Sequence, residues 1–424
     1  MAKLLVSKSG PLHGKVWISG AKHSVLPLLA ATIMTDSICE IVGVPDLTDV
    51  DVIKKMLMNY GAVVDDSKEG IIRTSAPEIV SCEGKRELVR KMRSSILTAA
   101  PILARHGKVM MPMPGGCAIG KRPIDLHLKG FKALSATVVE DIENETVTVI
   151  AGPAGLKGNV IHLDFPSVGA TENVLMAATL AKGTTIIQNA AKEPEIIDLA
   201  NFLNKMGACI KNAGTDIIKI EGVEKLSGCI HEVLPDRIET GTFMLAAAIT
   251  RGEILIRNTI PDHVESIIAK LRECNVDVEV TREGIYVDAR NRDLVATDIE
   301  TLPYPGLPTD IQSPFMAFLC TVNGNSVVRE TIFEDRFLHV AELNRMGADI
   351  MVDNCEATVR GNRELHGTKV SATDLRAGAA MVLAGLVASG TTEISEIYHI
   401  ERGYENLVGK LKALGADIMK IEQD

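Results

Sequence analysis

The chain has 424 residues, of which 46% are hydrophobic and 24% are charged, and its formal net charge is −10 at pH 7. This composition is typical of a globular protein with two or three domains, and the acidic balance argues against a nucleic-acid-binding surface. The apolar runs are too short to span a bilayer and residues 1–8 lack the apolar stretch of a signal peptide, so we expect a cytoplasmic protein that does not bind membranes.

Six repeats of about 70 residues follow one another along the chain. Each contains two helix-like runs and several short strand-like runs, and in each a small-residue corner precedes a β-like run. The corners begin at Gly61, Ser135, Gly207, Asn275, Gly347 and Gly415. Repeats of this length are larger than those of a solenoid, so we predict six small α/β modules. A break between the third and fourth repeats, near residues 222–233, predicts two domains of three modules each.

One helix of each repeat is apolar nearly all round and is therefore predicted to be buried. These helices cover residues 25–32, 95–104, 173–181, 242–249, 314–321 and 377–388. The other helix, as in residues 195–206 and 263–274, alternates apolar and charged faces and is predicted to cover the outside of its module.

Equivalent positions in the repeats fall at expected helix starts, and five of them carry a cation. These cations are Lys22, Arg93 and Arg376 before buried helices, and Arg122 and Arg402 before outer helices. A helix N-terminus already carries partial positive charge, so a cation there is unfavourable for the helix itself and favours a function such as anion binding. The alternative is that each cation pairs with a neighbouring carboxylate or lies in water.

A glycine-rich segment at residues 114–123 is the most distinctive local signal. Three glycines predict a mobile loop, and Cys117 lies on it with Lys121 and Arg122 four and five residues away. Positive surroundings stabilise a thiolate, and mobility suits a lid that closes over a substrate. The alternative is an ordinary apolar cysteine, which we expect for the other seven of the eight cysteines, because their spacing predicts no metal site.

Two helix starts offer polar groups whose role the residues themselves leave open. Thr309 or Asp310 is expected to cap the fifth buried helix, but Asp310 is also suited to take a proton from a substrate hydroxyl if it faces the cations. Ser167 and Thr171 open the third buried helix with two hydroxyls and free N–H groups. They suit a phosphate, and equally a capping box with Glu172.

Five segments together resemble the family of UDP-N-acetylglucosamine enolpyruvyl transferases, in the EPSP synthase superfamily. The segments are residues 20–27, 114–127, 167–171, 235–242 and 397–404. The likeness runs through the whole chain in unbroken order. It implies an α/β protein, a two-domain inside-out α/β barrel built from six βαβαββ units. Residues 22–232 would form the domain with the cysteine lid, and residues 1–21 plus 233–424 the other, with the active site in the cleft between them.

The resemblance implies transfer of the enolpyruvyl group of phosphoenolpyruvate to the 3′-hydroxyl of UDP-N-acetylglucosamine, with release of phosphate, as the first committed step of peptidoglycan synthesis. Cys117 would be the lid acid, which fosfomycin inactivates covalently in this family, and Asp310 would deprotonate the hydroxyl. Lys22, Arg122 and Arg402 would clamp the phosphate and carboxylate. The two substrates are the expected partners, no metal or other cofactor is expected, and the oligomeric state is not predicted.

The resemblance also implies a set of residues that bind the substrates. The set is Lys22, His23, Arg93, Arg122, Pro123, Ile124, Asp125, Leu126, Phe165, Pro166, Ser167, Val168, Gly169, Asp310, Ile332, Arg336, Arg376 and Arg402. The chain departs from the family at His23, where the family has asparagine. Two other functions stay open: enolpyruvyl transfer to shikimate phosphate, and a non-catalytic protein that only binds the nucleotide sugar.

Overall fold

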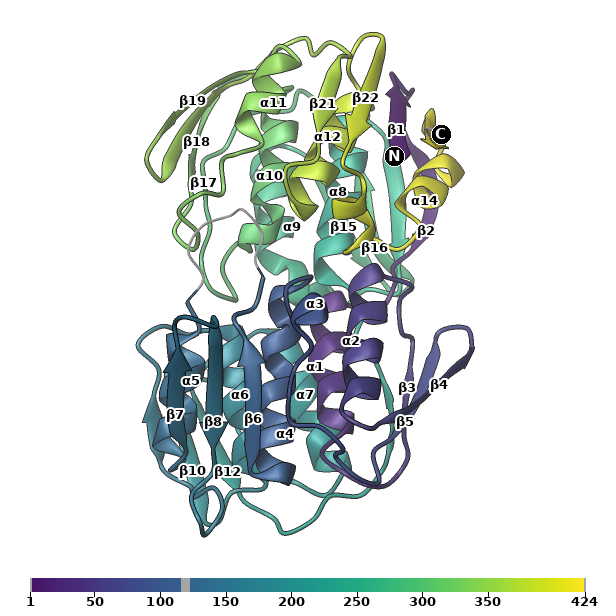
Figure 1. The fold of residues 1–424 in the computed structure, drawn as a ribbon. Helices are drawn as coiled ribbons and strands as arrows, with labels where there is room; N and C mark the ends of the chain where they lie inside the picture. Colours follow the sequence, from purple (N-terminus) through teal and green to yellow (C-terminus); the bar gives the residue numbers. More distant parts are fainter. Residues whose placement is uncertain (1, 116–122, 423–424) are drawn as a thin grey trace. The chain divides into compact units, whose positions relative to one another are not determined.

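The computed structural model describes residues 2–115 and 123–422, which form two compact units (Figure 1). Unit 1 comprises residues 2–19 and 235–422, and unit 2 comprises residues 20–115 and 123–234. Each unit has its own hydrophobic core. Within the described residues, no helix has both the length and the apolar composition needed to cross a membrane.

Unit 2 contains three small sheets and the helices that pack on them. The strand orders are β13 (Ile230–Glu232), β3 (Cys39–Val42), β5 (Ile71–Ser75) and β4 (Val63–Lys68); β6 (Lys108–Pro112), β8 (Thr146–Ile150) and β7 (Thr137–Asp141); and β11 (Cys209–Lys211), β12 (Ile217–Glu221), β10 (Thr184–Gln188) and β9 (Val160–His162). The helices are α1 (Lys22–Thr32), α2 (Thr48–Asn59), α3 (Arg86–Val89), η1 (Arg93–Thr98), α4 (Ala99–His106), α5 (Asp125–Ala133), α6 (Val168–Thr179) and α7 (Pro194–Lys205).

Unit 1 repeats this plan with three four-stranded sheets. Their orders are β15 (Asp277–Thr281), β16 (Gly284–Asp288), β14 (Glu253–Arg257) and β2 (His13–Trp17); β17 (Ile299–Glu300), β18 (Asn325–Arg329), β20 (Glu356–Arg360) and β19 (Asp349–Asp353); and β21 (Lys369–Ser371), β22 (Thr391–Ser395), β1 (Ala2–Ser7) and β23 (Ile418–Glu422). The helices are α8 (Arg237–Ile249), η2 (Pro261–Val264), α9 (Glu265–Glu273), α10 (Thr309–Leu319), α11 (Val340–Arg345), α12 (Leu375–Gly385), α13 (Tyr398–Glu401) and α14 (Leu407–Ala413).

Two strands exchange partners where the chain passes from one unit to the other. At α6, α10 and α12 the strand before the buried helix pairs in parallel with the strand after it, as β9 does with β10 across α6. β2, which precedes α1, pairs instead with β14 of unit 1, and β13, which precedes α8, pairs with β3 of unit 2. β2 therefore belongs to unit 1 although the next helix along the chain, α1, belongs to unit 2. In the same way, β13 belongs to unit 2 and the following helix, α8, to unit 1.

The buried helices confirm the α/β prediction. Nearly every residue of α1, α6, α8, α10 and α12 is buried. The second repeat differs, because its buried stretch begins as the 3-10 helix η1 and becomes α-helical only at Ala99. Pro101 lies in the first turn of α4, where its missing N–H removes no intrahelical hydrogen bond, so the late start suits it. The buried helices α1 and α10 nevertheless hold Pro27 and Pro314 in their interiors.

The two outer helices named above behave differently. Only Ile267, Ile268 and Leu271 of α9 are buried, so α9 covers the outside as predicted. For α7 the prediction is wrong, because most of its residues are buried and they include Glu195 and Asp198. Acidic side chains are tolerated inside a protein when other polar groups hold them, and such groups cannot be read from the helix alone.

Candidate active site

Asp310 lies in the first turn of α10 and is held between two arginines of unit 1. Its Oδ1 accepts a hydrogen bond from Arg336 Nη2 at 2.9 Å, and its Oδ2 accepts one from Arg376 Nε at 2.9 Å. The side chains of Arg336 and Arg376 are only 4% and 1% exposed, whereas that of Asp310 is 20% exposed. Arg376 comes from α12, which packs beside α10 (Figure 1). The structure thus brings three predicted site residues together, with an excess of positive charge.

Arg376 has donor capacity that the fold does not use. Its Nη1 and Nη2 are buried, and within the described part of the chain neither makes a hydrogen bond of good geometry, although the Tyr404 side chain lies against the guanidinium and interacts with it. Burial opposes the charge, but Tyr404 and Asp310 outweigh burial and hold the pKa of Arg376 above its ordinary value. The guanidinium carbon lies 5.1 Å from the centre of the Tyr404 ring, a cation–π contact. A buried guanidinium with two unused nitrogens is suited to a carboxylate or phosphate.

The predicted capping role of Thr309 or Asp310 is wrong. Pro308 occupies the N-cap of α10, and no side chain caps the helix. Thr309 Oγ1 instead donates to Glu330 Oε2 at 2.9 Å. Glu330 also accepts hydrogen bonds from the backbone N–H of Ile332 at 2.9 Å, so it fixes the predicted substrate-binding position 332 relative to α10. Sequence reasoning missed Glu330, because a lone glutamate after a strand carries no distinctive pattern.

Arg402 is not at a helix start, which corrects the repeat-based prediction. It directly follows the short helix α13 and forms its C-cap. A cation is favourable at that end, where the helix dipole is negative, so the local structure does not oppose Arg402 as it would at an N-terminus. Burial, and then the nearby Arg402, lower the pKa of His399.

Lys22 is the first residue of α1 in unit 2 and forms a buried ion pair. Its Nζ lies 2.7 Å from Asp49 Oδ2, and the two side chains are 7% and 4% exposed. Pairing with a carboxylate, the alternative considered for this cation, is therefore confirmed. Such a pair also keeps a buried ammonium charged, so it does not exclude binding of an anion. Asp49 lies on α2, and nothing in the sequence linked it to Lys22.

Further predicted residues of unit 2 meet near the start of α5. Arg93 Nη2 donates to the carbonyl oxygen of Pro123 at 2.8 Å. Pro123 is followed by Ile124, the N-cap of α5, and by Asp125, its first residue. α5 packs on α6, so residues 123–126 and the start of α6 lie in one region of the unit. At Gly169 a Cβ atom would lie 3.1 Å from His127 Cε1, so any other residue here would require the His127 ring to shift by a few tenths of an ångström.

The hydroxyl groups of Ser167 and Thr171, at the start of α6, make hydrogen bonds that stabilise the local structure. Ser167 Oγ accepts the N–H of Ala170 at 3.4 Å and caps the helix, and Thr171 Oγ1 accepts the N–H of Ala191 at 3.1 Å. Glu172 takes no part in a capping box. It is buried close to Glu195 and Glu193, and burial together with these carboxylates raises its pKa well above the usual range.

The remaining predicted residues are less informative. Phe165 is 43% exposed, and its carbonyl oxygen accepts the N–H of Ser167 at 2.7 Å. His23 is half-buried in the first turn of α1. Cys117 and Arg122 lie outside the described residues. Within residues 2–115 and 123–422, no group of three or more His, Cys, Asp or Glu side chains is arranged to hold a metal ion.

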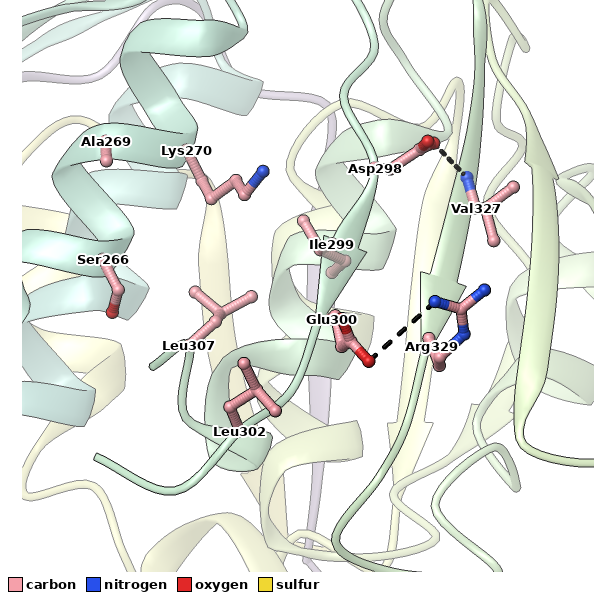
Figure 2. A pocket seen from close by; sticks show the side chains of 10 residues that line it. All are labelled: Ser266, Ala269, Lys270, Asp298, Ile299, Glu300, Leu302, Leu307, Val327 and Arg329. Atoms are coloured by element: carbon pink, nitrogen blue, oxygen red, sulfur yellow. Dashed lines mark hydrogen bonds and ion pairs between the residues drawn. The ribbon is translucent and has the colours of Figure 1, made fainter. Parts of the chain in front are cut away.

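A separate cavity of about 510 Å³ lies in unit 1 beside α9 and the edge formed by β17 and β18 (Figure 2). Its charged rim is internally paired: Lys270 Nζ lies 2.7 Å from Glu273, and Arg329 Nη1 lies 3.9 Å from Glu300. Its floor includes Ile299 and Leu307. No predicted site residue lines this cavity, so we do not place the chemistry there.

Comparisons with known proteins cover nearly the whole chain. Residues 6–411 match the family described as EPSP synthase (3-phosphoshikimate 1-carboxyvinyltransferase). The chain is 53% identical over 420 residues to UDP-N-acetylglucosamine 1-carboxyvinyltransferase 1 of Caldanaerobacter subterraneus, covering 99% of each protein. It is 50% identical over 425 residues to the protein of the same name from Staphylococcus epidermidis, covering 100% of each.

Solved structures share the fold. The enolpyruvyl transferase NikO from Streptomyces tendae has a TM-score of 0.88 and 25% sequence identity, and the match covers 100% of this chain and 99% of that one. An EPSP synthase from Acinetobacter baumannii has a TM-score of 0.77 and 18% identity, with 100% of both chains covered. The second likeness supports the fold alone.

Proposed function

The chain belongs to the EPSP synthase family, and from this premise we propose that it is an enolpyruvyl transferase acting on UDP-N-acetylglucosamine. The reaction transfers the enolpyruvyl group of phosphoenolpyruvate to the 3′-hydroxyl of the sugar and releases phosphate. The observation that carries the proposal is the identity of 50 to 53%, over essentially full length, to relatives named for this transfer. We further propose that the protein works in the cytoplasm on these two substrates.

Asp310 is proposed as the group that takes the proton from the sugar hydroxyl. In the structure both of its oxygens accept hydrogen bonds from arginines, which stabilises the carboxylate and weakens it as a base. Phosphoenolpyruvate carries a carboxylate and a phosphate that compete with Asp310 for the same guanidinium groups. We infer that binding this substrate draws Arg376 or Arg336 away from Asp310 and so strengthens the base when both reactants are present.

The addition step also needs a proton delivered to the methylene carbon of phosphoenolpyruvate. Cys117 is proposed as that acid and Arg122 as part of the clamp, and both lie outside the described residues. A positioned acid or base typically contributes about 10²–10⁴-fold to the rate, or roughly 3–5 kcal/mol each. Lys22, Arg376 and Arg402 are proposed to stabilise charge on the departing phosphate and the carboxylate.

An inorganic-phosphate release assay tests the proposed function. We expect phosphate release with phosphoenolpyruvate and UDP-N-acetylglucosamine together, and little with either substrate alone. We also expect fosfomycin and the Cys117→Ser substitution to reduce release. Faster release with shikimate 3-phosphate would assign the chain to the other reaction of its family. Binding of UDP-N-acetylglucosamine without any phosphate release, unaffected by Cys117→Ser, would indicate a non-catalytic binding protein.

His23 predicts an unusual pH dependence. A neutral histidine offers one donor and one acceptor only in the right tautomer, and a protonated one offers two donors, whereas asparagine keeps one of each at every pH. A bound phosphate favours the protonated form. We therefore expect kcat/KM to vary more between about pH 5.5 and 7.5 in the natural protein than in His23→Asn. Superimposable pH profiles for the two proteins would contradict this expectation.

A further inference from the structure

Three buried polar side chains of unit 2 join the start of α1 to α7 and β13. Ser24, in the first turn of α1, donates its hydroxyl hydrogen to Asp198 Oδ2. The other carboxylate oxygen, Asp198 Oδ1, lies 2.8 Å from His231 Nε2. The three residues are 0%, 3% and 4% exposed. Each comes from a different element, so the chain of hydrogen bonds fixes α1 against two neighbours.

Lys205, at the outer end of this chain, indicates which ring nitrogen of His231 donates to Asp198. Lys205 Nζ lies 3.1 Å from His231 Nδ1, and an ammonium group has hydrogen bonds only to donate. His231 Nδ1 is therefore the acceptor, and the ring proton lies on Nε2, where it is donated to Asp198. The Phe202 ring contacts His231 edge to face, with 5.4 Å between ring centres, and holds the imidazole in place. Asp198 therefore accepts hydrogen bonds from both Ser24 and His231.

The first turn of α1 lacks the usual means of fixing a helix start. Ala21 is the N-cap, and no side chain caps the helix. Backbone bonds hold this turn, such as that from Ala21 N to the carbonyl oxygen of Leu234 at 2.7 Å. Side chains hold it too: Lys22 pairs with Asp49, and the hydroxyl of Ser24 ties the turn to Asp198. Lys22 and His23 are the two residues immediately before Ser24, so a shift of Ser24 moves them as well.

We propose that Asp198 is a positioning residue for enolpyruvyl transfer, which places Lys22 and His23 by holding Ser24 in a carboxylate-centred chain anchored by His231. This proposal rests on the proposed function, because it assigns the benefit to phosphoenolpyruvate binding by the start of α1. Asp198 touches no substrate in this scheme. Its effect passes through one hydroxyl group, and Ser24→Ala removes that hydroxyl without changing any atom of Asp198 or His231.

Ser24→Ala tests the proposal, with Thr32→Val as the matched control. Both substitutions remove a fully buried hydroxyl from α1, but Thr32 Oγ1 donates only to the carbonyl oxygen of Leu29, within its own helix. We expect Ser24→Ala to raise the KM for phosphoenolpyruvate roughly tenfold, because small misplacements of binding groups are costly, and to leave the KM for UDP-N-acetylglucosamine within about twofold. Thr32→Val should leave both constants within about twofold.

Two further measurements distinguish a positioning role of Asp198 from a general loss of packing in the variants. If Asp198 acts through Ser24, the double variant Ser24→Ala/Asp198→Asn should be no worse than Asp198→Asn alone, since residues in one network are not additive. Hydrogen exchange of residues 20–27 should be faster in Ser24→Ala than in Thr32→Val, because the Val25 amide bond to Ala21 (2.9 Å) lies in the loosened turn. Hydrogen exchange needs no turnover, so it tests whether Ser24 anchors the first turn of α1 even if the natural protein proves inactive.

The outcomes are distinct. An active natural protein whose Ser24→Ala variant keeps its KM for phosphoenolpyruvate and its exchange pattern overturns the positioning role and leaves the proposed function intact. An inactive natural protein overturns the proposed function. Equal losses in Ser24→Ala and Thr32→Val, with matching falls in unfolding temperature, would show a general packing effect and would also overturn the positioning role. A selective loss in Ser24→Ala supports it.

Discussion

Replacing Asp310 with asparagine is expected to lower kcat/KM by about 10²–10⁴-fold, the usual contribution of a positioned base. An amide keeps the shape of the side chain but cannot accept the proton from the sugar hydroxyl. The same change removes the negative charge between Arg336 and Arg376. We expect it to reduce the free energy of unfolding by about 1–3 kcal/mol, less than for a fully buried pair, because Asp310 is 20% exposed.

Asp349→Asn is the matched control for this variant. Asp349 also lies between two arginines of unit 1, Arg363 and Arg360, but these arginines are 44% and 52% exposed, whereas those beside Asp310 are buried. Surface ion pairs contribute little, so we expect less than about 0.5 kcal/mol of destabilisation and unchanged turnover. Phosphate-release kinetics and denaturant unfolding measure the two effects. If Asp310→Asn turned over within about tenfold of the natural protein, Asp310 would not be the base.

Replacing Lys22 with methionine is expected to have two separable effects. Asp49, which is 4% exposed, loses its ammonium partner, so the free energy of unfolding should fall by about 3–5 kcal/mol. Turnover should fall by about 10²–10³-fold, because a cation that stabilises the transferred phosphate is lost. Lys54→Met is the control on α2: Lys54 pairs with the exposed Asp66, and its loss should cost less than about 1 kcal/mol.

The double variant Lys22→Met/Asp49→Leu distinguishes the two effects of Lys22. Replacing both members of a buried ion pair with apolar residues is often neutral or stabilising, so most of the lost stability should return. Turnover should stay low, because the ammonium is still absent. Recovery of turnover together with stability would mean that Lys22 acts only through folding, and its proposed role in the phosphate clamp would be wrong.

Much of the fold could be predicted from the sequence because the signals are local. An apolar helix such as residues 242–249 has few polar positions to expose, so it is buried in almost any packing arrangement. The same reasoning failed for α7, where Ser24 and His231, far away in the chain, hold the buried Asp198. It also failed for Arg402, because repeat spacing alone did not reveal that α13 ends before this residue.

The sequence predicted which residues belong to the candidate site better than it predicted which residues contact one another there. The repeat offset placed Asp310 and Arg376 at comparable helix starts, and the packing of α10 on α12 joins them at 2.9 Å. No pattern pointed to Asp49, the ion-pair partner of Lys22, or to Glu330, which holds Thr309 and the backbone of residue 332. Each is a single acidic residue whose partner lies on another element.

The sequence by itself determined six α/β modules with buried apolar helices and a set of cations at their starts, because periodicity and repeat spacing are properties of neighbouring residues. Only the tertiary structure decided that β2 and β13 exchange partners and that Asp310 lies between two buried arginines. It alone also linked Ser24 through Asp198 to His231. Strand pairs and buried ion pairs join residues far apart in the chain, and their geometry exists only once the helices have packed.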